Sequence, residues 1–180
     1  MIEKILQRQN DNGGQFWSRA DGDIHAPFGF STIDTLSVLG EIGYSINDNS
    51  QIASAIDFIF SYQTPEGCFK YSPKSSKLPC LTARIIAGLG RLGLENDKRI
   101  EASYKWMLDT QCDDGGWRCT TVKLGKSPLT DASNPGTTLY VLDAFRYRNN
   151  SVAEIDKLNK GVDFLLQHWE IRQPIGPCSF

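Results

Sequence analysis

A glutamine–glycine–aromatic pattern recurs along the chain and restricts its fold more than any other feature. The best copies read FIFSYQTPEGCF, ending at Phe69, and WMLDTQCDDGGW, ending at Trp117. Both follow the frame aromatic–aliphatic–x3–Gln–x3–Gly–x–aromatic. Two degenerate copies flank them, one at Gln9 with its aromatic residues one or two places late, and one in which Trp169 replaces the glutamine. A pattern that returns at intervals of roughly 50 residues predicts a fold of stacked, similar units.

Each copy of the pattern closes a stretch with helical periodicity. Between Gln51 and Gln63, apolar residues recur at spacings of three and four, which is typical of one face of a helix. The same spacing predicts amphipathic, exposed helices over residues 51–63, 97–111 and 152–169. The stretches between them are apolar or small on most sides, which predicts buried helices over residues 31–43, 79–93 and 135–148. One unit is therefore a buried helix, a short turn, an exposed helix and a Gly-rich loop.

The residues of the pattern suit a corner between helices. Gln111 stands where the last carbonyl groups of an outer helix lack partners, and we expect its amide to bond those carbonyls and the loop backbone. Gly115 and Gly116 permit the positive φ angles that reverse the chain. We expect Trp117 to fold back as an apolar plug between neighbouring hairpins.

Size and composition limit the classes of function. A chain of 180 residues, 40% of them hydrophobic and 22% charged, predicts one folded domain over residues 1–180. The net charge of −2 and the lack of a Lys/Arg cluster disfavour a nucleic-acid partner. No apolar run approaches the roughly 18 residues of a membrane span, and the polar N-terminus is unlike a signal peptide. We therefore expect a cytoplasmic location with reduced thiols, and five cysteines, an odd count, further disfavour a disulfide framework.

These residues and their spacing resemble the prenyltransferase/squalene oxidase repeat of the terpenoid cyclase and protein prenyltransferase superfamily. The resemblance covers nearly the whole chain and implies an all-α fold. That fold is an α/α toroid, in which inner helices line a cavity and outer helices surround them. The chain offers about three helical hairpins, fewer than a complete toroid holds. We therefore expect a partial toroid, either a piece of a longer chain or one whose open repeat ends self-associate.

In such a toroid, loops and the N-termini of inner helices surround the mouth of the cavity. We expect one rim to gather the polar residues Asp34, Cys80, Thr82, Asn134, Thr137 and Thr138. Helix capping or an ordinary surface position is the favoured interpretation of each of them. Asp34 and Cys80 are nevertheless candidates for catalysis. For Cys80 the reason is that a helix N-terminus lowers the pKa of a thiol. A buried, inert cysteine is the favoured alternative for Cys80.

The acid motif of the superfamily is incomplete in this chain. Class II terpenoid cyclases protonate their substrate with the middle aspartate of an Asp-x-Asp-Asp motif. The segment DGDI, with Asp21 and Asp23, lacks the last aspartate. Metal-dependent cyclases bind magnesium through an Asp-rich pair and a third aspartate. Asp113 and Asp114 form such a pair, but the segment DDGGW has no third aspartate. Magnesium is therefore implied only by family analogy.

Zinc is also implied only by family analogy. Protein prenyltransferases hold it with aspartate, cysteine and histidine, and no Asp-x-Cys pair here matches that pattern. His25 lies in a loop before an inner helix and could face the rim, which makes it a third catalytic candidate, whereas His168 is interpreted as structural. A structural zinc site in the corner turns is a less favoured alternative, and its ligands would be Cys68, Cys112 and Cys119.

Two long loops, QFWSRADGDIHAPFGF and RCTTVKLGKSPLTDASNP, each precede an inner helix. Connections of this length are often functional, and the second one supplies Lys123 to the rim. An aromatic cavity with a basic rim would suit an isoprenoid diphosphate, because rings contact the apolar tail or a carbocation and cations contact the phosphates. The predicted ligand-binding residues are Trp17, Arg19, Thr82, Trp117, Arg118, Asn134 and Thr138.

The sequence leaves two functions open. The first is an isoprenoid-handling protein, cyclase-like or transferase-like, and its support is the family resemblance. The second is a non-catalytic toroid module that binds a small molecule or another protein. The incomplete acid and zinc motifs support this alternative.

Overall fold

The computed structural model describes residues 2–119 and 133–172, and these residues form helices and loops without a β-strand. The elements in chain order are α1 (Ile2–Gln7), α2 (Thr32–Glu41), the 3-10 helix η1 (Ile46–Asp48), α3 (Ser50–Phe60), α4 (Pro79–Arg91), α5 (Lys98–Asp109), α6 (Pro135–Phe145) and α7 (Val152–Ile171). Each of the six long helices predicted from the periodicity is present, with ends within a few residues of the expected ones. The all-α prediction is confirmed.

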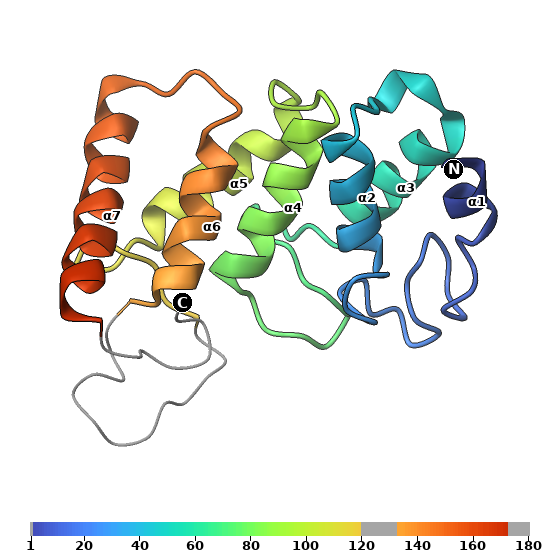
Figure 1. Ribbon diagram of the computed structural model, residues 1–180, viewed down its shortest axis with the longest axis horizontal. Helices are drawn as coiled ribbons and strands as arrows, with labels where there is room; N and C mark the ends of the chain where they lie inside the picture. The colour runs from blue at the N-terminus through green and yellow to red at the C-terminus, as the bar shows by residue number, and fades with distance from the viewer. Residues whose placement is uncertain (1, 120–132, 173–180) are drawn as a thin grey trace.

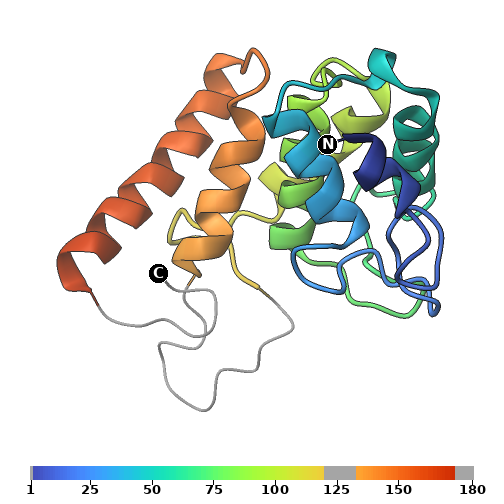
Figure 2. The same cartoon turned by 45° about the vertical axis from the view of Figure 1, so that its right-hand side comes forward.

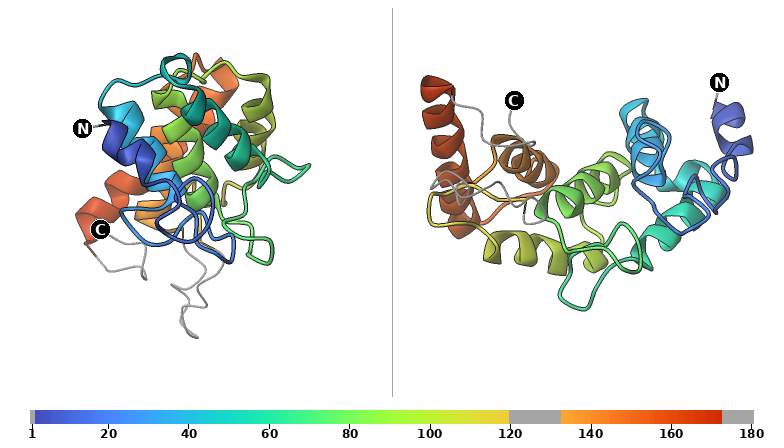
Figure 3. Two further views of the ribbon diagram at one scale, coloured as in Figure 1. Left: turned by 90° about the vertical axis from the view of Figure 1, so that its right-hand side faces the viewer. Right: turned by 90° about the horizontal axis from the view of Figure 1, so that it is seen from below.

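The helices form two curved layers around one concave side (Figure 1 and Figure 3). Seen from below in Figure 3, α2, α4 and α6 lie on the concave side, and α3, α5 and α7 lie behind them. Helix α4 lies between α2 and α6 and packs against both. The arc is open, with α1 at one end and α7 at the other (Figure 3), and Figure 2 shows these two helices on opposite sides of the molecule. The chain therefore forms part of an α/α toroid, with the predicted inner and outer layers.

Small residues let the inner helices approach closely. Gly88 of α4 faces Ser37 of α2, and a Cβ atom at Gly90 would lie 2.8 Å from the ring of Tyr147, just after α6. Both glycines are buried. A side chain at Gly90 would clash with Tyr147, and one larger than a methyl group at Gly88 would crowd Ser37, so these small residues permit the close packing of the three inner helices.

Capping residues fix where the helices begin. Asn49, Asp97 and Ser151 cap the outer helices α3, α5 and α7, each accepting a backbone N–H with its side chain. The inner helices α4 and α6 begin with a proline, where the missing N–H costs nothing. All three inner helices begin at the same end of the molecule, the lower edge in Figure 1, as predicted for a common rim.

The corner after α5 is held by Gln111. Its Nε2 donates to Gly115 O in the loop and to Lys157 O in α7, both at 2.7 Å. The loop bond was predicted, but the predicted bond to the end of α5 was wrong. Thr110 already satisfies those carbonyls, through its backbone N–H and through its hydroxyl, which donates to Met107 O at 2.9 Å. The amide of Gln111 is thus available to the next outer helix.

Gln63 makes the corresponding link one repeat earlier. Its Nε2 donates to Arg99 O at 2.8 Å and to Ser103 Oγ at 2.9 Å, and both partners belong to α5. Ser103 in turn donates its hydroxyl to Gly67 O in the corner loop. Each glutamine therefore ties its corner to the following outer helix.

The corner aromatic residue is the predicted plug. Trp117 is fully buried, and its Nε1 donates to Met107 O at 2.7 Å. Its ring reaches α7, where a Cβ atom at Gly161 would lie 2.8 Å from it. The indole therefore fills the space between two successive outer helices.

A threonine four residues into the next inner helix holds each corner from the other side. Thr82 of α4 accepts the backbone N–H of Phe69 at 3.0 Å, and Thr138 of α6 accepts that of Trp117 at 2.9 Å. Both threonines are fully buried. Each corner thus joins one outer helix to the next outer helix and to the next inner helix.

Candidate functional site

A groove of about 370 Å³ crosses the three inner helices on the side that the outer helices leave uncovered. Its walls come from α2, α4, α6 and the loop before α2, and α3, α5 and α7 contribute nothing to it. The lining residues are Phe28, Gly29, Ile33, Asp34, Ser37, Val38, Glu41, Arg84, Ala87, Arg91, Tyr140 and Asp143. A concave surface of mixed apolar and polar character is the usual form of a small-molecule site.

The charged residues of the groove follow from helical spacing. Asp34 and Glu41 on α2 are seven residues apart, and so are Arg84 and Arg91 on α4. Seven residues are close to two helical turns, so both members of each pair face the same side. Opposite charges on adjacent helices then meet across the groove.

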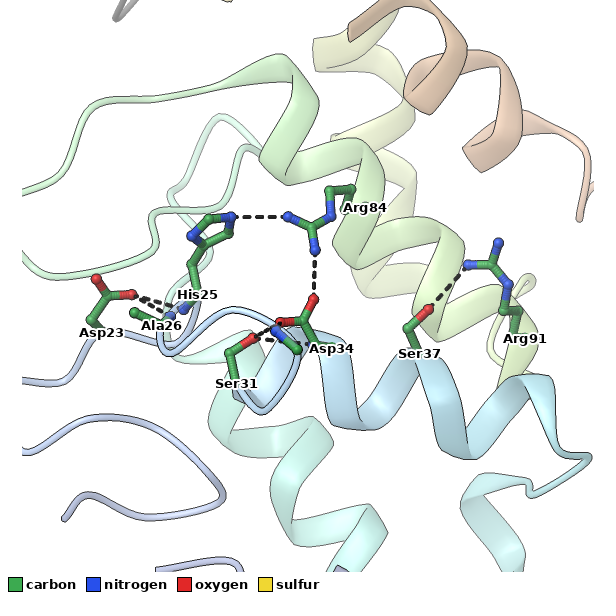
Figure 4. Close-up of polar contacts among 9 residues, drawn as sticks. Asp23, His25, Ala26, Ser31, Asp34, Ser37, Arg84 and Arg91 are labelled. Carbon is green, nitrogen blue, oxygen red and sulfur yellow. Dashed lines mark hydrogen bonds and ion pairs between the residues drawn. The ribbon is translucent and has the colours of Figure 1, made fainter. Parts of the chain in front are cut away.

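Asp34 is the centre of the first polar cluster (Figure 4). Its Oδ1 accepts Arg84 Nη2 at 2.6 Å, and its Oδ2 accepts Gly29 N–H at 2.7 Å and the Ser31 hydroxyl at 2.8 Å. The side chains of Asp34 and Arg84 are only 12% and 21% exposed. This partly buried ion pair joins α2 to α4 and fastens the loop before α2 to the rim of the groove.

His25 extends the same cluster into the loop. Its Nε2 lies 2.9 Å from Arg84 Nη1, and because a guanidinium group can only donate, Nε2 is the acceptor. Its backbone N–H donates to Asp23 Oδ1 at 2.8 Å. Burial lowers the pKa of His25, and the positive charge of Arg84 lowers it further, against the opposing effects of Asp34 and Asp23. A neutral imidazole thus helps to hold the loop against α4.

Arg91 forms the second cluster, two turns further along α4. Its Nη2 pairs with Asp143 Oδ2 of α6 at 2.7 Å, and its Nε lies 3.7 Å from Glu41 Oε1 of α2. Its guanidinium group also lies over the ring of Tyr147, 5.3 Å from the centroid. Arg91 therefore links all three inner helices.

The charge balance of the groove restricts its chemistry. The lining holds three carboxylates and two guanidinium groups, and each guanidinium group is already paired with an aspartate. A diphosphate in the groove would have to displace those aspartates. The exposed surfaces of Phe28, Val38 and Tyr140 instead offer contacts to an apolar ligand.

The structure brings two of the three catalytic candidates together. Asp34 and His25 both contact Arg84 at the rim. Cys80 lies at the second position of α4 and is half-buried. Thr137, also predicted at this rim, is buried, and its hydroxyl oxygen has no hydrogen-bond partner in the described part of the chain.

The residues predicted to bind ligand lie mostly in the corners, away from the groove. Thr82, Thr138 and Trp117 are buried in the corner contacts described above, and Asn134 Oδ1 accepts Cys119 N–H at 2.6 Å. Trp17 is 4% exposed.

The two arginines predicted for a basic rim also lie outside the groove lining. Arg19 pairs with Asp21 at 2.9 Å in the loop before α2. Arg118 is half-buried in the loop after Trp117. Lys123 and the last degenerate motif copy around Gly176 lie outside the described residues.

The cysteines proposed as zinc ligands are spread over two corners. Cys68 and Cys119 are buried, and Cys112 is half-buried. In residues 2–119 and 133–172, no three His, Cys, Asp or Glu side chains are grouped so that they could hold a metal ion. Cys68 Sγ instead forms a hydrogen bond with Thr64 Oγ1, 3.0 Å away in the same turn.

Sequence reasoning missed Arg84, Arg91, Tyr140 and Asp143 as groove residues. A signal was present in LTARIIAGLGRLG, where two arginines seven apart interrupt a helix predicted to be buried. Charges on a buried helix need partners or an accessible surface. That argument would have placed both arginines on the concave side.

The layered helices, the corner motif and the groove across the inner helices define a repeat protein of the α/α-toroid class. The chain belongs to the squalene-hopene cyclase C-terminal domain family, whose model matches residues 23–173. It is also similar to the geranylgeranyl transferase type-2 subunit beta of Saccharomyces cerevisiae, with 26% identity over 108 residues. That match covers 57% of this chain and 31% of the yeast protein. None of the described helices has the length and apolarity of a bilayer span.

Proposed function

We propose that this protein binds an isoprenoid-type ligand in the groove on the concave side of its inner helices. The observation that carries the proposal is the partly exposed apolar surface within the groove. Val38 and Tyr140 are each 44% exposed there, and Phe28 at the rim is 82% exposed. A hydrocarbon chain would cover this surface and gain the free energy of burying it. The family of the chain supports the same class of ligand.

The charges in the groove favour an isoprenoid with an uncharged head group. A diphosphate would meet Glu41, and Asp34 and Asp143 already occupy both guanidinium groups. An alcohol head group could instead donate to a carboxylate without displacing it. We therefore expect geranylgeraniol to bind more tightly than geranylgeranyl diphosphate. In this proposal Asp34 and His25 position the rim. Cys80, half-buried and outside the groove lining, stays a candidate for catalysis only.

The test is a binding titration with a dansyl-labelled isoprenoid alcohol, followed by fluorescence anisotropy. Val38→Asp should weaken binding by about ten-fold or more, because it places a charge against the hydrocarbon. Val162→Asp on α7, with similar exposure but outside the groove, is the matched control and should bind like the wild type. Equal binding by both variants, or no binding by the wild type, would refute the proposal.

A competition experiment decides between head groups. Unlabelled geranylgeraniol should displace the probe at lower concentration than geranylgeranyl diphosphate does. The basic-rim hypothesis predicts the opposite order, together with weaker diphosphate binding by Arg19→Ala and Arg118→Ala.

The alternative function is a non-catalytic interaction module. The polar clusters favour it over catalysis, because Asp34 and Arg91 both hold elements of the fold together. Incubation of the protein with geranylgeranyl diphosphate and product analysis tests catalysis directly. Recovery of unchanged substrate alongside measurable alcohol binding is the outcome expected of a binding module.

A further inference from the structure

His25 joins the loop before α2 to helix α4 through a bond that depends on the protonation state of the imidazole (Figure 4). Its Nε2 lies 2.9 Å from Arg84 Nη1, and a guanidinium group can only donate a hydrogen bond. The bond therefore forms only while Nε2 carries no proton. Protonation would place one N–H group against another and would bring two positive charges together. The two side chains would then repel each other.

Arg84 is fixed from its other side, so this repulsion acts on the loop. Its Nη2 donates to Asp34 Oδ1 at 2.6 Å, and its side chain is only 21% exposed. Its guanidinium group also lies 5.8 Å from the centroid of the Tyr140 ring on α6. These contacts do not involve His25 and remain when the imidazole is protonated. The imidazole is therefore the partner that moves.

The loop is anchored on both sides of this bond. Ile24 is fully buried, and its N–H donates to Tyr71 O at 2.8 Å. On the other side, Gly29 N–H donates to Asp34 Oδ2 at 2.7 Å. Between these anchors, in the part of the chain that the structure describes, the bond to α4 is the one hydrogen bond from residues 25–28 to a helix. Loss of this bond would therefore free a short segment and leave the rest of the loop in place.

We propose that His25 is a pH-sensitive contact, which holds residues 25–28 against α4 while the imidazole is neutral and releases them when it is protonated. Phe28 and Gly29 line the groove across the inner helices, so release of the segment changes one edge of the groove. The release itself does not depend on what the groove binds. Its effect on ligand binding rests on the proposed function.

The groups that face His25 determine the direction in which pH acts. They come from α4, α2, the same loop and the segment after α3, and they are Arg84, Asp34, Asp23 and Tyr71. Burial and the charge of Arg84 lower the pKa of His25 below its usual value of 6.5, although the two aspartates raise it. In the released segment the imidazole is surrounded by water, so its pKa returns toward the usual value.

The contact is therefore intact above about pH 6.5 and weakens as the pH falls below that value. The reason is that the released segment binds a proton more tightly than the segment held against α4. Between pH 7.5 and pH 5.5 the ratio of released to held segment should rise by up to about ten-fold.

The test is an NMR titration of the protein from about pH 8 to about pH 5. The chain has two histidines, so the C2 proton of His25 is assigned as the signal that is missing from His25→Gln. We expect its midpoint below pH 6.5. The backbone order parameters of Ala26 and Phe28 should be lower at pH 5.5 than at pH 7.5, because the segment is then released. The order parameter of the buried Ile24 should be the same at both.

Two substitutions fix the charge at this position. His25→Gln keeps an acceptor for Arg84 and stays neutral, so its segment should remain ordered at both pH values. His25→Lys is positively charged at both, so its segment should be mobile even at pH 7.5. His168→Gln changes the other histidine, on α7, and should keep the pH dependence of the wild type. Circular dichroism melting checks that each variant folds.

Binding of the dansyl-labelled isoprenoid alcohol tests the effect on the groove. The wild type should bind it up to about ten-fold more weakly at pH 5.5 than at pH 7.5, whereas His25→Gln should bind it equally at both. Equal binding by the wild type at both pH values would refute the effect on the groove. A wild type that binds no alcohol at either pH refutes the proposed function, and the NMR titration still decides whether His25 releases the loop.

Three NMR results would overturn the proposal. One is a midpoint of His25 at or above pH 6.5, and another is an order parameter at Ala26 and Phe28 that does not change with pH. The third is a segment in His25→Gln that still becomes mobile at low pH, because another group would then control it.

Discussion

Trp117 and Trp17 are the buried aromatic plugs of two different corners, but the backbone that positions them differs. In the corner after α5, Trp117 Nε1 donates to Met107 O at 2.7 Å, and in the corner after α1, Trp17 Nε1 donates to Ile5 O at 3.1 Å. Both acceptors stand four residues before the corner glutamine. Trp17 comes two residues later in its copy, and the extra length is absorbed by left-handed backbone at Phe16 (φ 47°) and Trp17 (φ 63°).

The glutamines of the same two corners differ in what they bind. Gln111 donates to Lys157 O and ties its corner to α7. Gln9 Oε1 is buried, and it has no hydrogen-bond partner in the described part of the chain. The comparison shows that left-handed backbone can bring a tryptophan that comes two residues late into the buried plug position. The hydrogen bond from the glutamine to the next outer helix, however, forms only when the whole corner has the normal length.

The largest difference between the corners should come from truncating the plugs. Trp117→Ala should lower the free energy of unfolding by about 4 kcal/mol, because it leaves a closed cavity between α5 and α7. Trp17→Ala should lower it by about 2.5 kcal/mol, because Trp17 borders a groove of about 450 Å³ into which neighbouring side chains can relax. Urea unfolding followed by circular dichroism measures both. Equal losses would mean that the two plugs are equivalent.

Adding a methyl group at the corner glycines should separate strain from crowding. Gly115 and Gly13 both have φ of 87°, but a Cβ atom would lie 2.6 Å from Lys160 O at Gly115 and 3.3 Å from Ala20 Cβ at Gly13. Gly115→Ala should therefore cost about 3 kcal/mol, from backbone strain and from displacement of α7. Gly13→Ala should cost about 1 kcal/mol, mainly from backbone strain, because the Ala20 side chain needs to move by only a few tenths of an ångström. Thermal melts of the two variants give the comparison, and a larger cost at Gly13 would contradict it.

Replacing the corner glutamines should give the smallest effect and the clearest contrast. Gln111→Met should cost about 1.5 kcal/mol, because it removes the donor to Gly115 O and Lys157 O. Gln9→Met should change the free energy of unfolding by less than about 0.5 kcal/mol, because the oxygen it removes has no partner. Chemical denaturation of both variants under one condition checks this. Similar losses at both positions would show that Gln9 also ties its corner.

The helices and their two layers could be predicted from the sequence because both depend on local periodicity. In the outer helices apolar residues recur every three or four positions on one side only, whereas α4 is apolar on most sides. This difference identifies which helices are exposed and which are buried. The burial of Trp117 followed from the corner pattern as well. The left-handed backbone at Phe16 and Trp17 could not be predicted, because bulky aromatic residues rarely adopt a positive φ.

The candidate site was predicted less well, because its contacts depend on how the helices pack. Asp34 was identified from its place at the N-terminus of an inner helix, and His25 from the loop before that helix. Their common partner Arg84 comes from the next repeat, 50 and 59 residues away. Thr82 and Thr138 were predicted to face a ligand from their position near helix N-termini. Only the packed structure shows that their hydroxyl groups accept the N–H groups of the corners.

Hydrogen–deuterium exchange of Gln111→Met, compared with Gln9→Met, tests most directly whether corner glutamines hold consecutive outer helices together. We predict faster exchange in Gln111→Met at the amides of α7 around Lys157, with exchange in α3 unchanged, and no change in either helix for Gln9→Met. Unchanged exchange in α7 of Gln111→Met, or an equal increase throughout the molecule, would contradict this account.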